Sequence, residues 1–322
     1  MTLLSPPKTY LFKEIEGHCS GGCYIDVYLP SVSPSEGGKT PVALLIHGGA
    51  FIVGERGEIP DHQINYLLEK GIAVVDVDYR KAPHVGFVEM IADCQSAYDF
   101  IRSDLNDLLK KDGYDQGELD KDNIAFGGYS AGSYLAAMLA LQTKPKALLL
   151  FYGLFDLLQI SPAPKEAYML GCKPEEIAYM NQLRDQEIVI GAPTLMPDTS
   201  ARKVYLHALL LAGSLIATLL PADLPDDQET RTSFSPAFLA TADFPPSFFI
   251  VPQIDMLVPC SQSWLFAKRL EELGVEVGTM RVDGAPHAYD RKGGPQNELD
   301  GSNWIKGTLP GLEFLVDKLG RK

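Results

Sequence analysis

The five residues Gly128-Tyr129-Ser130-Ala131-Gly132 constrain the fold of this 322-residue chain more than any other stretch. They stand between a short apolar run at 124–126 and a longer one at 134–139, as expected for a strand that leads into a helix. Such a sharp turn strains the serine backbone, and the two flanking glycines let strand and helix approach closely. The pattern predicts that the Ser130 hydroxyl lies above a sheet, near a helix N-terminus that stabilises negative charge.

A second glycine-containing motif follows an earlier apolar stretch. Residues 41–46 indicate a buried strand, and His47-Gly48-Gly49-Ala50-Phe51 comes directly after it. A loop that aims backbone N–H groups at a substrate oxygen needs small residues, because they permit close approach and unusual dihedrals. Either motif alone is compatible with an ordinary turn, but the two in this order predict an oxyanion site. We expect its N–H groups to come from Gly49, Ala50 and Ala131, with Gly48 shaping the loop and His47 bracing it.

An acid and a base are expected to follow the serine in the order Ser, Asp/Glu, His. Asp255 comes shortly after a strand-like run at 248–251, and His287 follows an alternating run at 275–282. Each candidate thus lies on a loop after a predicted strand, where active sites of open α/β sheets gather. His84 is the best rival for the base, but it precedes the serine. The predicted catalytic residues are therefore Ser130, Asp255 and His287.

These motifs resemble those of the α/β-hydrolases, in particular the hormone-sensitive-lipase-like esterases with their H-G-G-G motif, and especially fungal members of small-molecule metabolism. The likeness extends from about residue 42 to the C-terminus. Ala50 stands in place of the third glycine, and Tyr129 and Ser133 replace a common acidic residue and a glycine. Kynurenine-formamidase-like and feruloyl-esterase-like branches share the same skeleton. Further family-like marks are Asp78-Tyr79-Arg80 with Ala82-Pro83, Ser235-Pro236 and Pro245-Pro246.

The order of predicted elements agrees with this resemblance. Strands alternate with helices after an antiparallel pair near the N-terminus, which predicts a mostly parallel, doubly wound sheet of about eight strands, the α/β-hydrolase fold. Residues 1–155 and 235–322 are expected to form the core domain. Residues 156–234 break the strand–helix rhythm and are too long for a simple connection, so they are expected to form an inserted helical cap.

The expected cap contains a run of seventeen residues without a charge, 204–220, which is near the lower limit for a membrane span. A span there would place Ser130 and Asp255 on opposite sides of the bilayer. We therefore expect no membrane span and interpret the run as a cap helix over the active site. Together with Met169 and Met180 it suggests an adaptable apolar pocket. The residues expected to contact the substrate are Phe51, Tyr129, Leu210 and Met256.

Composition excludes some partners. The net charge of −14 argues against nucleic acid and against an anionic membrane surface. The first residues lack a basic segment followed by an apolar one, so we expect no signal peptide and a cytoplasmic location. We expect a monomer or a homodimer. The spacing of Cys19 and Cys23 suggests a metal knuckle or a disulfide, but no second pair completes a metal site. We expect two free thiols, no metal and no cofactor.

Three functions stay open at this point. The favoured one is hydrolysis of a carboxylic ester of a hydrophobic small molecule, in which Ser130 attacks the acyl carbonyl, His287 takes its proton and Asp255 orients the imidazole. The second uses the same residues on an amide, a thioester or a carbon–carbon bond in a biosynthetic pathway. The third is a ligand-binding protein without catalysis, which the simultaneous presence of serine, aspartate and histidine disfavours.

Overall fold

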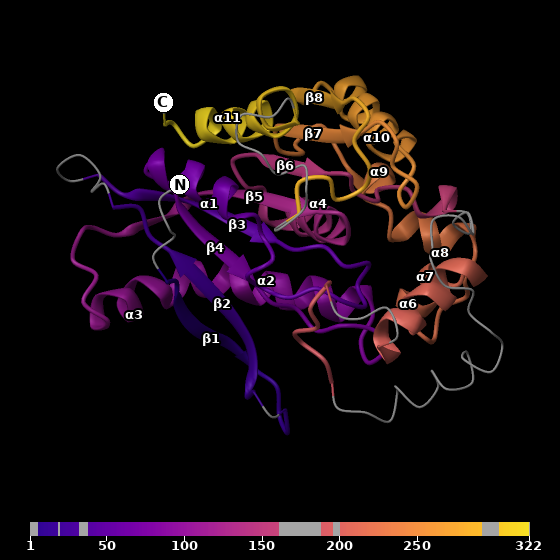
Figure 1. The fold of residues 1–322 in the computed structure, drawn as a ribbon, viewed down its shortest axis with the longest axis horizontal. Helices are drawn as coiled ribbons and strands as arrows, with labels where there is room; N and C mark the ends of the chain where they lie inside the picture. Colours follow the sequence, from indigo (N-terminus) through magenta and orange to yellow (C-terminus); the bar gives the residue numbers. More distant parts are fainter. Residues whose placement is uncertain are drawn as a thin grey trace.

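The structure, a computed structural model, describes residues 6–18, 20–31, 38–160, 188–195, 200–291 and 303–321. These residues build one eight-stranded sheet in the order β1-β2-β4-β3-β5-β6-β7-β8 (Figure 1). The first two strands run antiparallel to each other, β2 runs antiparallel to β4, and the remaining neighbours are parallel. The strands are β1 Lys8–Glu14, β2 Gly22–Tyr28, β3 Thr40–Ile46, β4 Ala73–Val77, β5 Leu119–Tyr129, β6 Leu148–Phe151, β7 Ser247–Pro252 and β8 Val277–Val282.

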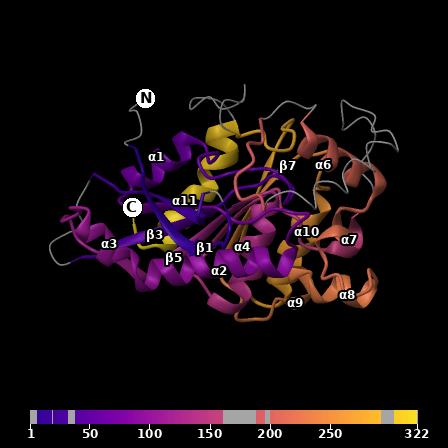
Figure 2. The same cartoon turned by 90° about the horizontal axis from the view of Figure 1, so that it is seen from below.

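Helices cover both faces of the sheet (Figure 2). One buried cluster packs α2, α4 and α10 against one face, and a second packs α1 and α11 against the other. The predicted doubly wound sheet is thereby confirmed. The helices are α1 Asp61–Glu69, α2 Phe87–Ser103, α3 Leu105–Lys111, α4 Ala131–Thr143, α6 Ala201–Ala212, α7 Leu215–Leu219, α8 Gln228–Ser233, α9 Pro236–Leu239, α10 Ser261–Glu272 and α11 Leu309–Lys318, with shorter turns η1 Leu157–Gln159 and η4 Trp304–Thr308.

The segment predicted as a cap lies partly outside the described residues, Met169 and Met180 included, so its boundaries stay a prediction. Helices α6, α7 and α8 gather at one side of the molecule in Figure 1. The apolar run 204–220 does not form one helix, because α6 ends at Gly213, whose left-handed φ of 68° closes it, and α7 begins at Leu215. In the described part of the chain, no helix is long and apolar enough to cross a membrane.

The turn from β5 into α4 depends on two glycines. A side chain on Gly132 would collide with the carbonyl oxygen of Ile46 at the end of β3, and one on Gly128 would collide with the Gly132 backbone. Ser130 between them has φ 53° and ψ −116°, a conformation that non-glycine residues rarely adopt. The strained turn predicted from the sequence is present, and the neighbouring strand determines how tightly it must pack.

This packing predicts the cost of adding one methyl group. Gly132→Ala should lower the free energy of unfolding by about 3 kcal/mol or more, because backbone atoms of β3 cannot move aside easily. Gly113→Ala is the matched control: its added methyl group meets no atom within 4 Å, so only its positive φ of 79° is penalised, by about 1–2 kcal/mol. Urea unfolding curves of the two variants give the comparison. Equal losses would contradict the packing argument.

Candidate active site

The loops that carry the predicted site residues meet at one edge of the sheet. Parallel pairing places Ile46 of β3 opposite Gly128 of β5, and Pro252 of β7 opposite Val282 of β8. The carboxyl ends of these strands therefore point the same way. His47 and Ser130 directly follow β3 and β5, and Asp255 and His287 lie on the loops after β7 and β8. This is the crevice position expected for an open α/β sheet.

Ser130, His287 and Asp255 form a continuous hydrogen-bonded chain. The Ser130 Oγ atom lies 2.9 Å from Nε2 of His287, and Nδ1 of the same ring lies 2.6 Å from Oδ2 of Asp255. The Asp255 side chain is 1% exposed and that of His287 11% exposed. Since a carboxylate only accepts, Nδ1 carries a proton, and Nε2 of the neutral ring is left to accept from the serine hydroxyl.

The Asp255 carboxylate is held by the backbone around it. Its Oδ1 atom accepts hydrogen bonds from the N–H groups of Leu257 at 2.9 Å and Val258 at 2.8 Å. The other oxygen is thereby left for His287. This local turn defines both the position and the orientation of the carboxylate.

The glycine loop after β3 presents backbone N–H groups beside Ser130. Gly49, Ala50 and Phe51 all have positive φ, at 111°, 50° and 67°. A Cβ on Gly48 would lie 2.8 Å from the Tyr129 carbonyl oxygen and 3.1 Å from Cβ of Ser130. Among the described residues, the N–H groups of Gly49, Ala50 and Ala131 donate to no protein acceptor. Three donors without a protein partner next to a serine hydroxyl are the arrangement that an oxyanion site requires, and the oxyanion role of these residues stays a prediction.

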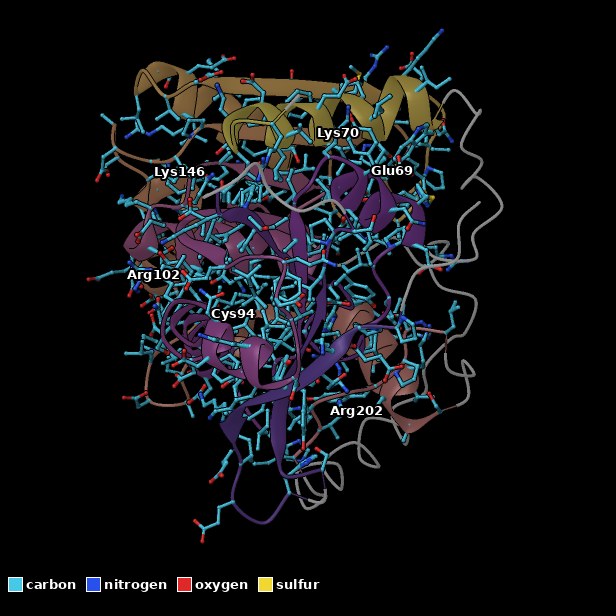
Figure 3. All side chains as sticks on the ribbon, turned by 90° about the vertical axis from the view of Figure 1, so that its left-hand side faces the viewer. Glu69, Lys70, Cys94, Arg102, Lys146 and Arg202 are labelled. Carbon is cyan, nitrogen blue, oxygen red and sulfur yellow. The ribbon has the colours of Figure 1, made fainter. Side chains whose placement is uncertain are left out.

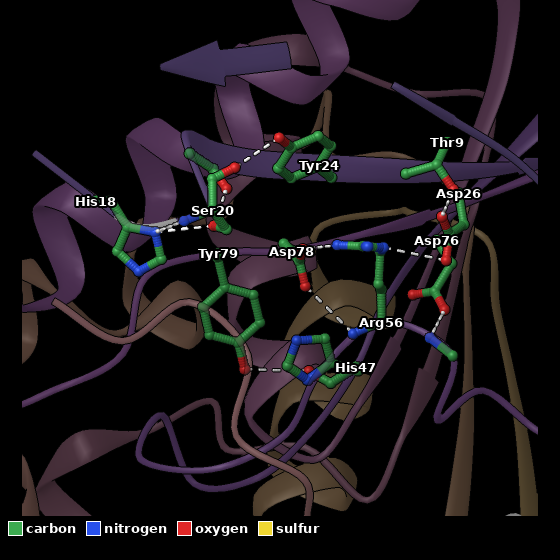
Figure 4. A network of polar contacts seen from close by, with 12 residues as sticks. Thr9, His18, Ser20, Tyr24, Asp26, His47, Arg56, Asp76, Asp78 and Tyr79 are labelled. Carbon is green, nitrogen blue, oxygen red and sulfur yellow. Dashed lines mark hydrogen bonds and ion pairs between the residues drawn. The ribbon is translucent and has the colours of Figure 1, made fainter. Parts of the chain in front are cut away.

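The histidine that was expected to brace this loop is fully buried beneath it. Nδ1 of His47 lies 2.7 Å from the Gly48 carbonyl oxygen, and its ring stacks on Tyr79 at 4.6 Å. The Tyr79 hydroxyl donates to the carbonyl of His47 at 3.2 Å (Figure 4) and to that of Gly48 at 3.3 Å. Burial, together with the charge of Lys81, lowers the pKa of His47 well below its usual value. His47 is therefore a neutral, structural imidazole.

A buried polar network that the sequence analysis missed lies next to His287. The ring of Tyr152 meets the imidazole edge to face at 4.8 Å, and its hydroxyl donates to Asp290 at 2.6 Å. Gln63 of α1 donates to the other Asp290 oxygen at 2.7 Å and accepts from the Tyr129 hydroxyl at 2.6 Å. Burial raises the pKa of Asp290. Asp290 follows His287 by three residues, but nothing in the sequence indicates Gln63 as its partner.

A largely apolar cavity of about 840 Å³ opens over the serine. Its lining includes all four residues expected to contact the substrate: Phe51, Tyr129, Leu210 and Met256. Of these, Phe51 is 2% exposed and Met256, on the Asp255 loop, is 52% exposed. Helices α6 and α7 both contribute lining residues, so the region predicted as a cap shares a cavity with Ser130. The substrate contacts themselves stay a prediction.

Among the residues that the structure describes, the remaining histidines and cysteines form no metal-binding group. His84 is not among the residues that line the cavity, whereas His207 of α6 is. Within the described ranges, no cluster of three or more His, Cys, Asp or Glu residues could hold a metal. Cys19 and Cys172 lie outside those ranges, and Cys23 is a buried free thiol. The structure gives Cys23 no disulfide partner, and the free thiol expected at Cys19 stays a prediction.

The fold and this site define a class of protein. A family model described as "alpha/beta hydrolase fold" matches residues 43–291. The chain belongs to the α/β-hydrolase family, and the resemblance drawn from its motifs is confirmed.

Individual relatives add to this assignment. The chain is 26% identical over 342 residues to the non-reducing polyketide synthase stbA of Stachybotrys bisbyi, covering 97% of the chain but only 15% of that synthase. An α/β-hydrolase superfamily protein from Enterococcus faecalis superposes with a TM-score of 0.66 at 19% identity, over 97% of this chain and 98% of the other. Butyrate-bound esterase 2 of Thermogutta terrifontis gives 0.60 at 17% identity, over 98% and 94%. At these identities the two structures establish the fold alone.

The buried side chain of His62, which takes no part in the hydrogen-bonded chain of Ser130, His287 and Asp255, should make stability depend on pH. Burial lowers the pKa of His62, which packs on Trp304 at 4.8 Å, from 6.5 to about 4. Between these values the unfolded chain binds a proton that the folded chain excludes, so stability falls as pH drops from about 6.5 to 4. His62→Gln should flatten this part of the profile, measured as melting temperature against pH. The parent protein scanned in the same buffers is the reference, and an unchanged slope for His62→Gln would contradict the assignment.

Proposed function

We propose that this chain is a serine hydrolase that cleaves a carboxylic ester of a hydrophobic small molecule through an acyl-enzyme. The observation that carries the proposal is the hydrogen-bonded chain from Ser130 through His287 to Asp255. It ends on the cavity floor, beside three N–H groups that lack a protein acceptor. A non-catalytic binding protein would have no need for this arrangement in a strained turn.

The proposed reaction has two halves, acylation of Ser130 and hydrolysis of the acyl-enzyme. Ser130 Oγ attacks the acyl carbonyl while Nε2 of His287 takes its proton, and Asp255 stabilises the imidazolium through Nδ1. The imidazolium then gives the proton to the leaving alkoxide. A water molecule then attacks the acyl carbonyl while the same nitrogen takes its proton. As the bond to Ser130 Oγ breaks and the carboxylic acid leaves, the imidazolium returns this proton to Ser130 Oγ. Water is the second substrate.

We assign the N–H groups of Gly49, Ala50 and Ala131 to stabilise the negative charge that develops on the carbonyl oxygen. Gly48 keeps the loop close to Ser130. The unusual φ angles of Gly49 and Ala50 support this role, because strained backbone is retained where the surrounding structure uses it. A single donor in such a site is worth about 10²–10³ in kcat.

The apolar lining supports an apolar acyl or alcohol group. We assign residues 156–234 to a cap that supplies part of this lining, including Leu210, and the remaining part to Phe51, Tyr129 and Met256. The Tyr129 hydroxyl is used internally by Gln63, so Tyr129 offers the substrate its ring and backbone rather than its hydroxyl.

The first test is ester turnover. Ser130→Ala should lower hydrolysis of p-nitrophenyl butyrate at least about a thousandfold, because the nucleophilic oxygen is lost from a loop tip. His287→Ala should be nearly as harmful, and Asp255→Asn less so. His84→Ala and the surface control Ser96→Ala should keep most activity. An organophosphate label should map to Ser130 by mass spectrometry; full turnover by Ser130→Ala would refute the proposal.

A thioester is the second candidate, and the similarity to a polyketide synthase favours it. The chain aligns with about 15% of that synthase, so a related segment exists there within a much longer polypeptide. An enzyme that assembles an acyl chain on a thiol must finally release it, and the proposed triad performs that step equally well. The leaving thiolate would then take the proton from His287.

The two candidates differ in the leaving group, which gives a direct comparison. The substrates are an alkyl oxygen ester and an N-acetylcysteamine thioester of the same acid, measured as kcat/KM with Ser130→Ala as blank. An ester hydrolase should turn over the oxygen ester at least as well as the thioester. A preference of more than about tenfold for the thioester would instead identify a thioester hydrolase. Turnover should persist with EDTA; loss on chelation, restored by a divalent metal, would contradict both.

A further inference from the structure

Lys81 is a buried cation that the proposed reaction does not use. Its side chain is 0% exposed, and it belongs to the segment after β4 that runs beneath the glycine loop. Among the described residues it forms no ion pair with a carboxylate. The Tyr79 ring, whose centroid lies 3.4 Å from Nζ, offsets part of the cost of burial. Burying an ammonium without a carboxylate partner is nevertheless costly, so a position of this kind calls for a functional explanation.

The contacts of Lys81 point to the histidine under the loop. Its Nζ atom donates to the Tyr79 carbonyl at 2.6 Å and lies 3.2 Å from Nε2 of His47. An ammonium can only donate, so Nε2 must be the acceptor. On the other side of the ring, Nδ1 faces the Gly48 carbonyl oxygen at 2.7 Å, and a carbonyl can only accept. Both neighbours therefore select the same tautomer, with the proton on Nδ1.

The Gly48 carbonyl controls a group that faces the substrate. It belongs to the same planar peptide unit as the N–H of Gly49, and the two point in opposite directions. Fixing the oxygen towards His47 and Tyr79 therefore turns the Gly49 N–H away from them, towards the cavity beside Ser130. If the proton moved to Nε2, the Nδ1 lone pair would face the carbonyl oxygen and repel it.

We propose that Lys81 is a positioning residue that holds His47 in its Nδ1–H tautomer and so aims the Gly49 N–H at the oxyanion. This inference rests on the proposed function, since it assigns a purpose to a residue behind the oxyanion site. It concerns the rate of the chemical step, and the substrate pocket itself is not altered.

The charged and titratable surroundings of Lys81 support a pH-dependent readout. Burial lowers the pKa of Lys81 to about 8, and the nearby Arg202 acts in the same direction, whereas Asp78, Cys23 and Cys94 oppose it. Burial raises the pKa of both thiols, so they stay neutral. Above about pH 8 the neutral amine can also accept from Nε2–H, so only the Gly48 carbonyl still favours the Nδ1–H tautomer and the selection weakens. kcat should then fall on the alkaline side.

The test is Lys81→Met, which keeps the length of the side chain and removes the charge. We expect kcat for p-nitrophenyl butyrate to fall about tenfold, KM to stay within about twofold, and the alkaline fall near pH 8 to disappear. The melting temperature should stay the same or rise, because a buried charge is replaced by an apolar group of similar volume. If Lys81 had only a structural role, Lys81→Met would instead lower the melting temperature. Lys146→Met, at an exposed position across the molecule from Arg202 in Figure 3, is the control.

A double-mutant cycle identifies the route through His47. In His47→Asn the amide N–H can replace Nδ1–H without help from Lys81, so Lys81→Met should cost little more in that background. The ring ¹⁵N shifts of His47 should report Nδ1–H in the parent protein and a tautomer mixture in Lys81→Met. An unchanged kcat for Lys81→Met, or the same loss in both backgrounds, would overturn the inference while Ser130→Ala remains inactive. An active Ser130→Ala would overturn the proposed function itself.

Discussion

The close approach of two backbones is the constraint on which this site depends. The turn from β5 into α4 packs directly against the end of β3, and only glycine at position 132 leaves room for the Ile46 carbonyl. This contact brings Ser130 next to the glycine loop that follows β3. Parallel pairing then carries the ends of β7 and β8 to the same edge. The proposed nucleophile, oxyanion donors, acid and base thus converge because the strands are neighbours in the sheet.

The same edge concentrates features that do not favour stability. Ser130, Ala50, Phe51 and Tyr152 all have positive φ without being glycine. Strained backbone persists where surrounding contacts determine it, and here those contacts are hydrogen bonds and buried aromatic rings. Tyr152, for example, is held by the buried carboxyl of Asp290 and packs its edge on His287. The rigid surroundings of the proposed triad thus include strained backbone and buried polar groups, both of which lower the stability of the fold.

The glycine loop is held from two sides, which links the described part of the inserted region to the chemistry. Arg202 of α6 donates to the carbonyls of Ile52 and Ala82 at 2.9 Å, and the Lys81 N–H donates to Val189 at 2.7 Å. The segments on either side of this contact, 51–53 and 80–82, are therefore tied by hydrogen bonds to α6 and to Val189, both within the region predicted as a cap. A substitution that moved α6 would therefore also disturb the glycine loop through these hydrogen bonds.

The sequence alone determined much of this protein, because the signals concerned are local. Alternating strands and helices, the glycines around Ser130, and the chain order of Asp255 and His287 depend on periodicity and turn chemistry within short windows. It could not indicate that Lys81 reaches His47, or that Gln63 and Tyr152 share Asp290, since these partners lie 34, 227 and 138 residues apart. Which polar groups become neighbours in the interior depends on how the helices and loops pack over the sheet. Only the tertiary structure decides those pairings, and with them the tautomer and orientation of the groups behind the site.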